Sequence, residues 1–407
     1  MTVDRSSTTA ITVALCVLAA VCEGVDLQAA GIAAAGVSGD FHPTPDQLGT
    51  FFSASTFGLF LGALAGGRLS DRLGRKVTLT GSVILFGVCS LANALAWDIQ
   101  SLIIARFATG LGLGGALPNV LALVAESSAP NRRNFNIAAA YSGMPAGGAL
   151  ISLLSMAMPV SQWRLIFVIG GLLPLLAAPL MVKYLRGSAG AEVPARASRP
   201  PAVSVSSALR AALSLPLVAR TLLFWAAFFL GLFTLYLLLN WLPTLMLDAG
   251  LQRSTVTVIQ VGFNAGGVVA ALLIGRLLES RWRRVAVAVT FLLLPLLIRA
   301  LAAMPSQQAM LILVVVALGS AVLASQAYLY ATAPLLYPKL VRGLGVGVAV
   351  AVGRIGSFVG PKYGGIWKGL GLDSSGVLLK LLPIAIAGSV LAIVLSWLPP
   401  VRSDLDD

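Results

Sequence analysis

Long apolar segments separated by short polar ones make up most of this chain of 407 residues. Twelve segments reach the roughly 20 residues that a helix needs to cross a bilayer. They are Ile11–Ala35, Gln47–Leu69, Val77–Ala96, Ser101–Ala125, Asn134–Met158, Leu165–Leu185, Thr221–Leu247, Thr255–Leu278, Val285–Met304, Ala309–Ala331, Gly343–Trp367 and Gly376–Trp397. Apolar and polar residues do not alternate in them, which favours helices over a β-barrel. The pattern predicts an all-α membrane protein with twelve transmembrane helices.

The composition supports this prediction. Apolar residues make up 58% of the chain and charged residues 11%, and the mean hydropathy is +0.92. An ordinary soluble domain has about 25% charged residues, so a soluble protein, a disordered chain and a coiled coil are all excluded. The three cysteines and the single histidine, His42, form no metal-binding pattern. We therefore expect neither a metal ion nor another cofactor.

Basic residues gather on one side of the predicted spans. Twenty of the 28 lysines and arginines lie at the termini or in connections on the same side as the termini, whereas six lie on the opposite side. Because basic loops stay in the cytoplasm, both termini are expected there, with the chain in the inner membrane of a bacterium. The surplus positive charge would then face anionic lipid, and we expect no binding to nucleic acid.

The longest polar break divides the chain into two halves. Residues 186–220 contain Pro194, Pro200 and Pro201 with scattered serine and arginine, which is typical of a linker. The predicted bundles are residues 1–185 and residues 221–407, with six spans each. The halves share a faint repeat at an offset of 208 residues: Gly67, Asp71, Arg75, Lys76 and Pro130 match Gly275, Glu279, Arg283, Arg284 and Pro338. Two pseudo-symmetric six-helix bundles around a central site are typical of transporters.

The connection after the second span carries a dense motif, Gly-Arg-Leu-Ser-Asp-Arg-Leu-Gly-Arg-Lys, from Gly67 to Lys76. Gly67 would let two helices approach closely, and Gly74 would permit a tight turn. Asp71 could face the positive N-terminal end of a neighbouring helix. The basic members would bind lipid headgroups; they are Arg72, Arg75 and Lys76. Such a clasp would hold helices together in one conformation and release them in another.

This motif resembles the loop motif of the major facilitator superfamily, and the chain resembles that superfamily over its whole length. Arg106–Gly110 and Gly143–Gly148 are similar to two further motifs of the superfamily. The resemblance implies the major facilitator fold, in which two six-helix bundles rock around a central site. It also implies a transporter that works by alternating access.

Within the superfamily, the first span is similar to the Asp-Gly-x-Asp signature of the aromatic acid:proton symporters. It contains Glu23-Gly24-Val25-Asp26, with glutamate in place of the first aspartate. Asn240–Pro243 and Gly353–Gly356 also resemble that family, and Gly112–Asn119 resembles its 3-(3-hydroxyphenyl)propionate transporters. The resemblance implies import of an aromatic carboxylate together with protons.

Four charged residues are expected near the centre of the bilayer, where each costs roughly 2.5–3.5 kcal/mol on insertion scales. They are Glu23, Asp26, Arg106 and Arg354. Glu23 and Asp26 are three residues apart and therefore share one helix face. Two carboxylates in a low dielectric resist simultaneous ionisation, so we expect at least one of them to take up and release a proton. The alternative is that one acid only pairs with an arginine.

The two arginines have different expected partners. Arg354 has no acidic residue within four positions on its own helix. Since a guanidinium can hold a carboxylate through two parallel hydrogen bonds, we expect Arg354 to bind the substrate carboxylate. The alternative is a fixed salt bridge to Asp26 or Glu23. Arg106 is expected to pair with Asp26 and to control its protonation, unless its side chain extends to the membrane surface.

Several polar residues fall in the middle of predicted spans, mostly in pairs four residues apart. They are Tyr236 and Asn240, Gln260 and Asn264, Gln326 and Tyr330, and Tyr141. We expect them to line a flat, mostly apolar slot for the aromatic substrate. The alternative for each residue is a hydrogen bond that only packs one helix against another.

The sequence therefore predicts a proton-coupled importer of an aromatic carboxylate, acting as a monomer. In the expected cycle Asp26 loads a proton with help from Glu23, Arg354 holds the substrate, and rocking of the bundles releases both into the cytoplasm. The alternatives are an importer of another organic anion such as muconate or a sugar acid, a drug exporter, a membrane-embedded enzyme or a sensor. An enzyme is disfavoured because no nucleophile and base are evident. The glycines of Gly110–Gly115 lack the strand that a dinucleotide site requires.

Overall fold

The computed structural model describes residues 5–129, 132–185, 217–278, 280–304, 307–333, 336–337 and 342–398. Its helices are α1 (Arg5–Phe41), α2 (Pro45–Leu73), α3 (Arg75–Ala94), α4 (Ile99–Gly114), α5 (Ala116–Ser127), α6 (Arg133–Met156), the 3₁₀ helix η1 (Val160–Gln162), α7 (Arg164–Tyr184), α9 (Val218–Asp248), α10 (Arg253–Leu278), α11 (Arg283–Ala302), α12 (Gln308–Thr332), α13 (Arg342–Gly369) and α14 (Ser374–Trp397). Since α4 and α5 together make one span, the twelve predicted spans are confirmed. Within the described residues, every span except α10 and α13 is also long and apolar enough on its own to count as a candidate membrane span.

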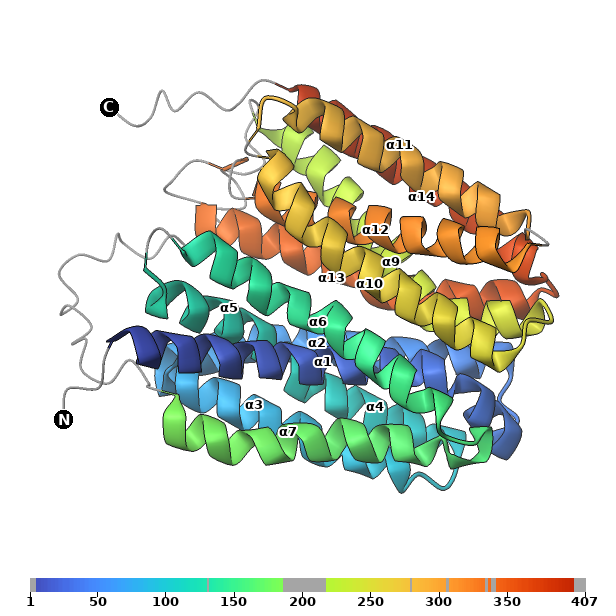
Figure 1. The fold of residues 1–407 in the computed structure, drawn as a ribbon, viewed down its shortest axis with the longest axis horizontal. Helices are drawn as coiled ribbons and strands as arrows, with labels where there is room; N and C mark the ends of the chain where they lie inside the picture. The colour runs from blue at the N-terminus through green and yellow to red at the C-terminus, as the bar shows by residue number, and fades with distance from the viewer. Residues whose placement is uncertain are drawn as a thin grey trace.

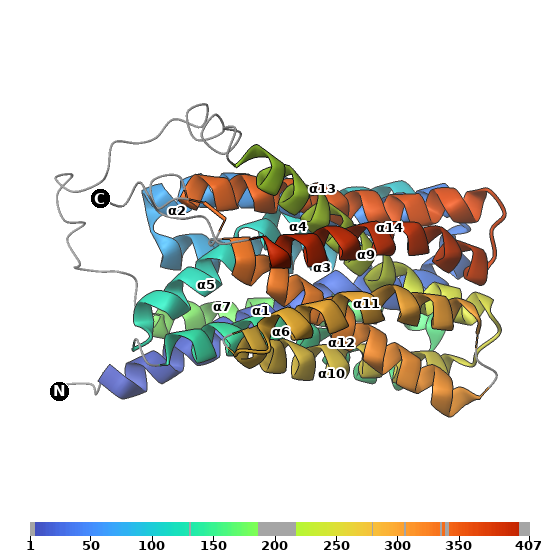
Figure 2. The same cartoon turned by 90° about the horizontal axis from the view of Figure 1, so that it is seen from above.

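The helices form two bundles that lie side by side (Figure 1). Helices α1–α7, blue to green, make one bundle, and α9–α14, yellow-green to red, make the other; the helices run along the long axis in both views (Figure 2). The bundles meet where α2 packs on α13, α6 on α10 and α1 on α9. We call the end where α1 begins and α2 ends the basic end, and the end where α1 ends and α2 begins the opposite end.

Part of the predicted connection between the bundles falls outside the described residues. This applies to residues 186–216, and also to Pro130, Glu279 and Pro338 of the predicted repeat. The predicted end of the linker at residue 220 is corrected, because Val218–Arg220 already belong to α9.

Local signals in the sequence fix several helix ends at the opposite end. Thr44 begins α2 with a capping box: its hydroxyl accepts from the amide of Gln47 at 3.2 Å, and the Gln47 side chain accepts from the Thr44 amide at 2.9 Å. Asp98 and Asp373 cap α4 and α14 in the same way, each accepting a backbone amide in the first turn. These caps supply partners for helix amides beyond the apolar segments, so the helices extend past the bounds that hydropathy predicts.

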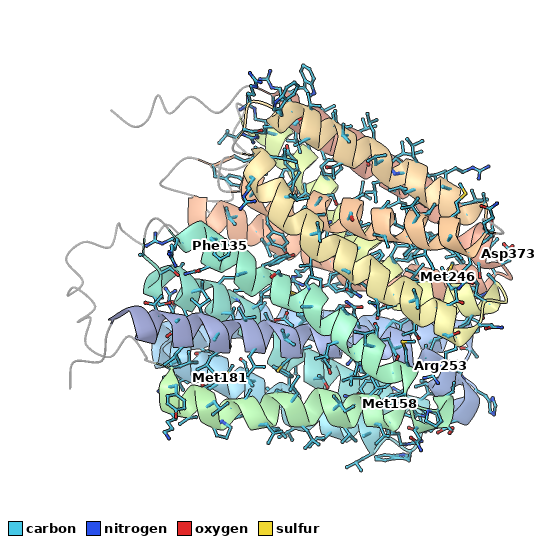
Figure 3. The ribbon with its side chains drawn as sticks, viewed as in Figure 1. Phe135, Met158, Met181, Met246, Arg253 and Asp373 are labelled. Carbon is cyan, nitrogen blue, oxygen red and sulfur yellow. The ribbon has the colours of Figure 1, made fainter. Side chains whose placement is uncertain are left out.

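The outer surface of the bundles is apolar. Leu176, Leu296 and Leu313 are 71%, 63% and 67% exposed on three different helices. Side chains of this kind cover the outward faces of the helices along their length (Figure 3). A soluble protein rarely exposes apolar surface this extensive, so the chain is a multi-pass membrane protein whose outer faces contact lipid.

Glycines bring α2 and α4 into direct backbone contact. A Cβ atom on Gly58 or Gly62 would collide with the backbone of α4, and one on Gly110 or Gly114 would collide with the backbone of α2. At the basic end of this seam, a Cβ on Gly66 would come within 2.7 Å of the Gly115 Cα. The close approach predicted for Gly67 is therefore wrong, because Gly67 has open space where its side chain would be and Gly66 faces the neighbouring helix.

The fourth predicted span is interrupted at Gly115, between α4 and α5. Pro118 lies four residues after Gly114 and has no amide hydrogen to donate to the Gly114 carbonyl. The loss of this bond weakens the helix at the point where α4 ends, although the apolar pattern continues. A single uninterrupted helix over Ser101–Ala125 is therefore corrected to two helices in one span.

Candidate functional site

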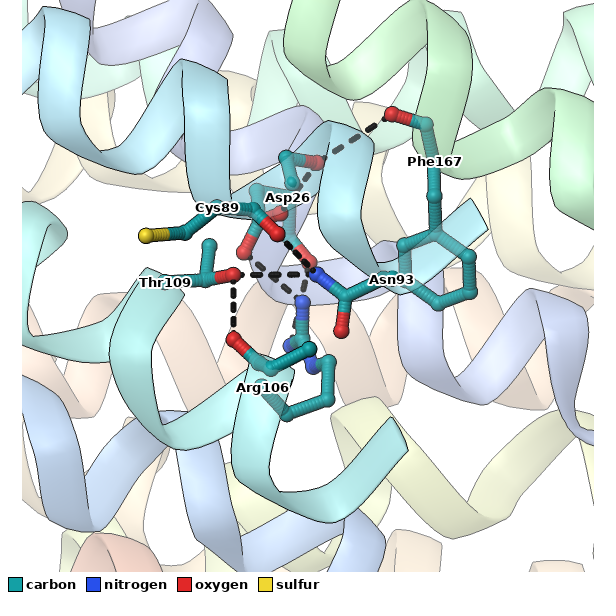
Figure 4. Close-up of polar contacts among 8 residues, drawn as sticks. Asp26, Cys89, Asn93, Arg106, Thr109 and Phe167 are labelled. Atoms are coloured by element: carbon teal, nitrogen blue, oxygen red, sulfur yellow. Dashed lines mark hydrogen bonds and ion pairs between the residues drawn. The ribbon is translucent and has the colours of Figure 1, made fainter. Parts of the chain in front are cut away.

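A buried ion pair lies inside the N-terminal bundle (Figure 4). The Arg106 guanidinium on α4 contacts the Asp26 carboxylate on α1 at 2.9 Å and donates a second hydrogen bond to the Asp26 carbonyl at 3.3 Å. Asp26 is 0% and Arg106 1% exposed. The structure thus brings together the two residues predicted to pair, and the Arg106 side chain does not extend to the surface.

Further groups from α3 and α7 surround the pair. Ser90 donates to the second Asp26 carboxylate oxygen at 3.1 Å, and the Arg106 guanidinium lies 5.7 Å from the centre of the Phe167 ring. Asn93 donates to the Thr109 hydroxyl at 2.9 Å. Both oxygens of Asp26 therefore have partners, so its negative charge is compensated although no solvent reaches it.

Glu23 lies one turn from Asp26 on α1 and has a different environment. Its side chain is 1% exposed, and neither carboxylate oxygen has a hydrogen-bond partner among the described residues. Its electrostatic neighbours include Arg354 of α13 and the hydroxyls of Tyr141 and Tyr236. An ionised carboxylate without a partner is very costly at such a place, so Glu23 is expected to be protonated in this conformation.

Arg354 is the corresponding cation of the C-terminal bundle. It is 8% exposed, and its guanidinium donates one hydrogen bond, of 2.9 Å, to the Tyr236 hydroxyl on α9. No ion pair joins Arg354 to Asp26 or to Glu23. The fixed salt bridge considered as an alternative is therefore not formed in this structure, and most of the guanidinium donors are available.

A cavity lies at the junction of the two bundles, beside Arg354. Its walls are mainly leucines and tyrosines from both bundles, and its polar lining consists of Gln28, Tyr141, Tyr236, Asn264, Tyr330 and Arg354. The Tyr141 and Tyr330 rings face each other across the bundles with centres 6.1 Å apart. The cavity volume is about 40 Å³; roughly 10–15 Å³ of such space holds one water molecule. A substrate of aromatic size therefore requires the walls to move apart.

Three of the predicted lining residues do not line this cavity. Asn240 donates to the Tyr236 carbonyl of its own helix at 2.9 Å, and Gln326 packs beside Gly231 of α9. Gln260 lines a second cavity, toward the opposite end, together with Arg253 and Trp163. The four-residue spacing placed each pair on one helix face but did not show which member points into the cavity.

Gln28 is a site residue that was not among those predicted from the sequence. Gln28 lies on α1, exchanges hydrogen bonds with Asn264 of α10 at 2.7 and 2.8 Å, and accepts one from Gln260 at 3.0 Å. A Cβ on Gly148 would collide with the Gln28 amide, so this glycine leaves room for the side chain. The available signal was a glutamine two residues after Asp26 in an otherwise apolar span.

Further contacts join the bundles at the opposite end. Lys362 of α13 pairs with Asp46 of α2 at 2.7 Å and donates to Thr50 at 2.7 Å. Arg253 of α10 donates to the carbonyls of Ser155 and Met158 at the end of α6, and Figure 3 shows Arg253 and Met158 close together. These contacts hold the two bundles together at the opposite end.

The loop motif at the basic end is placed only in part as predicted. Gly74 has φ +83° between α2 and α3, in agreement with the expected tight turn. Arg75 pairs with Glu126 of α5 at 2.6 Å, and Lys76 donates to the Val182 carbonyl of α7 at 2.8 Å. Asp71 and Arg72 are exposed, and among the described residues Asp71 forms no ion pair. The clasp function of the motif stays a prediction.

A cavity with a buried arginine between two six-helix bundles is typical of a membrane transporter of the major facilitator type, and the chain belongs to the Major Facilitator Superfamily, whose profile matches residues 16–361. It is 40% identical to the 3-(3-hydroxy-phenyl)propionate transporter of Escherichia coli strain K12, over 97% of this chain and 96% of that protein. It is 32% identical to a 4-hydroxybenzoate transporter of Pseudomonas putida, over 92% and 90% of the two chains.

A solved structure supports the same fold. The xylose transporter XylE from E. coli superposes with a TM-score of 0.74, covering 97% of this chain and 99% of its own, at 13% sequence identity. At this identity the likeness concerns the fold alone. The chain is a transporter and not an enzyme, as the sequence analysis predicted.

Proposed function

We propose that this protein imports a hydroxylated aromatic carboxylate, such as 3-(3-hydroxyphenyl)propionate, together with one or more protons by alternating access. Similarity over nearly the whole chain to transporters named for 3-(3-hydroxy-phenyl)propionate and 4-hydroxybenzoate supports this substrate class. The protein would act in the inner membrane of a bacterium, with the basic end in the cytoplasm. The central cavity lies between the two bundles of one chain, and the protein would act as a monomer.

The observation that carries the proposal is the available guanidinium of Arg354. It lies in a cavity walled by leucine and tyrosine, and among the described residues its hydrogen bond goes to a neutral hydroxyl, that of Tyr236. A buried guanidinium gains most from a partner with a negative charge and two oxygens, which an aromatic acid provides. The apolar walls suit the ring of the same molecule. A cationic drug would be repelled, which disfavours the drug-exporter alternative.

Glu23 is the better placed proton carrier in this conformation. Protonation of Asp26 would leave the buried charge of Arg106 without its partner, which is costly. Glu23 has no such partner to lose and lies near Arg354. We therefore assign proton exchange to Glu23 and a supporting role to the pair of Asp26 and Arg106, which reverses the emphasis of the sequence prediction.

The cycle follows from these assignments. With the opposite end open, Glu23 takes up a proton and Arg354 binds the substrate carboxylate. Lys362 and Arg253 then re-form their contacts with α2 and α6 and close that end. Opening of the basic end releases the substrate and the proton. The empty protein then returns to the conformation that is open at the opposite end.

Uptake of labelled 3-(3-hydroxyphenyl)propionate into cells tests the proposal. We expect wild-type uptake to fall when a protonophore collapses the proton gradient, and uptake by Arg354→Met to be lost. Arg354→Lys keeps the charge but not the paired donors, so partial uptake by this variant would support a carboxylate clamp. Full uptake by Arg354→Met in equally expressed protein would exclude Arg354 as the anion site, and absence of uptake by wild type would exclude this substrate.

A further inference from the structure

Three side-chain amides cross the junction of the bundles, and the backbone fixes their orientation. Asn264 donates to the Gln260 carbonyl at 2.9 Å, so the nitrogen of its amide must face that side. The same nitrogen donates to the Gln28 side-chain oxygen at 2.8 Å, which makes that oxygen an acceptor. The Gln260 amide can therefore contribute only its nitrogen to Gln28, at 3.0 Å.

This chain of bonds leaves one acceptor unused. The Gln260 side-chain oxygen is buried and has no hydrogen-bond partner among the described residues, and the residue is 2% exposed. A buried oxygen without a partner loses its hydration without compensation. A donor brought by another molecule would compensate this loss.

The three amides also separate two cavities. Gln28 and Asn264 line the central cavity with Arg354, whereas Gln260 lines the cavity on the side of the opposite end. Gln28 belongs to the N-terminal bundle and the other two residues to the C-terminal bundle. When the bundles part at the opposite end, the bonds between Gln28 and α10 must break, and the freed amides then face the open site.

We infer that these amides form hydrogen bonds with the ring hydroxyl of the substrate, at a position separate from Arg354, which binds the carboxylate. The inference rests on the proposed function and names Gln260, Asn264 and Gln28 as specificity-determining residues. A phenolic hydroxyl both donates and accepts, so it can donate to the Gln260 oxygen and accept from an amide nitrogen that the parted bundles leave free. The site therefore prefers an aromatic acid with a ring hydroxyl over the same acid without one.

The amide contact also makes this preference depend on conformation. With the opposite end open, the freed amides bind the hydroxyl. When that end closes, Gln28 re-forms its bonds with Asn264 and Gln260 and competes with the hydroxyl for them. The hydroxyl is thus held more strongly in the conformation open at the opposite end than in the closed one, so the substrate itself favours the open conformation by this difference.

The test compares 3-(3-hydroxyphenyl)propionate with 3-phenylpropionate, which has the same carboxylate and chain but no ring hydroxyl. Each labelled acid is offered to cells that produce wild type, Gln260→Met, Asn264→Leu or Gln308→Met. Gln308 is an exposed glutamine of α12 whose amide bonds to Thr255 outside the central cavity, so it is the matched control. The ratio of the two uptake rates within one variant does not depend on how much protein has folded.

We expect wild type and Gln308→Met to favour the hydroxylated acid by roughly ten-fold, the value of about one well-made hydrogen bond. In Gln260→Met and Asn264→Leu the ratio should fall to within about two-fold, chiefly through slower uptake of the hydroxylated acid. An unchanged ratio in both variants would overturn the inference, as would a wild-type ratio near one with both acids transported.

Two other results are distinguishable from these. If wild type transports neither acid, the proposed function is wrong, and the inference that rests on it is wrong as well. If a variant is inactive with both acids, the purified variant is tested for binding through the rise in unfolding temperature caused by each acid. A wild-type ratio of the two apparent affinities in that assay would overturn the inference, and a ratio near one would support it.

Discussion

Two buried charge sites lie one turn apart on α1 and differ in how their charges are compensated. Asp26 is enclosed within the N-terminal bundle, and its two oxygens are bonded to Arg106 and Ser90. Glu23 lies toward the other bundle near Arg354, yet no hydrogen bond or ion pair reaches its carboxylate. Burial in the membrane therefore does not by itself identify the residues that take part in transport. At a similar depth, Asp26 forms an ion pair, which we call the completed pair, whereas Glu23 and Arg354 form none and are the incomplete pair.

The difference has a physical consequence. A completed pair lowers the energy of one conformation and resists change, since removing either charge leaves the other buried alone. An incomplete pair can gain partners from outside the protein, here a proton and a carboxylate. The following substitutions test whether the two sites differ in this way.

The largest expected effect is on stability. Arg106→Met leaves the Asp26 carboxylate buried without its cation, which should cost about 3–5 kcal/mol. The unfolding temperature of the purified protein would measure this loss. The double variant Asp26→Leu with Arg106→Met should recover most of the stability, because it leaves no unpaired charge. A single variant as stable as wild type would show that the pair is not the completed site described here.

Glu23→Gln should affect coupling far more than stability. The amide has almost the shape of the protonated acid, and no bond in the structure depends on the carboxylate. We expect protonophore-sensitive accumulation to fall by at least about ten-fold, one order for each 1.4 kcal/mol of lost driving force. Exchange of labelled for unlabelled substrate should persist. Accumulation by Glu23→Gln at the wild-type level would assign the proton to another group.

Tyr236→Phe should have a moderate effect on affinity. It removes the hydroxyl that accepts from Arg354 at 2.9 Å and leaves the ring in the cavity wall. Since a hydrogen bond to a charged group contributes about 1.5–3 kcal/mol, the KM for the aromatic acid should rise by roughly ten-fold, with little change in the maximal rate. Concentration-dependent uptake provides both values. An equal loss of maximal rate would instead indicate a role in the conformational step.

The smallest effect is expected for Lys362→Met. Its ion pair with Asp46 joins the bundles at the opposite end, and the two side chains are 36% and 59% exposed. Exposed pairs contribute about 0–1 kcal/mol, so uptake should change by less than about five-fold and should depend less on salt than in wild type. A loss of transport as complete as that expected for Arg354→Met would mean that this contact is as important as the buried site.

Much of the fold could be predicted from the sequence because lipid imposes a simple rule on it. Spans of twenty or more apolar residues and the pairing of Asp26 with Arg106 follow from the cost of exposing polar groups to hydrocarbon. The turn at Gly74 follows instead from the positive φ that glycine adopts readily. The break at Gly115 was missed because hydropathy does not register the missing amide hydrogen of Pro118.

The site was predicted less completely. Periodicity places Gln260 and Asn264 on one face but cannot show that Gln28 of the other bundle reaches them, since that contact depends on how the bundles dock. For the same reason Asn240 and Gln326 appeared equivalent to Tyr236, although only Tyr236 reaches Arg354. The rotation of each helix about its axis decides such contacts, and neighbouring helices determine it.

The glycine seam between α2 and α4 joins these two helices into one closely packed pair. Backbone approaches backbone closely at Gly58, Gly62, Gly110 and Gly114. At the opposite end, this helix pair contacts the other bundle, where Gly49 of α2 packs against Gly365 of α13. At the basic end, α2 leads into the turn at Gly74 and the ion pair of Arg75 with Glu126. We therefore expect α2 and α4 to move as one unit, so that a separation of Gly49 from Gly365 at the opposite end would tilt both helices at the basic end.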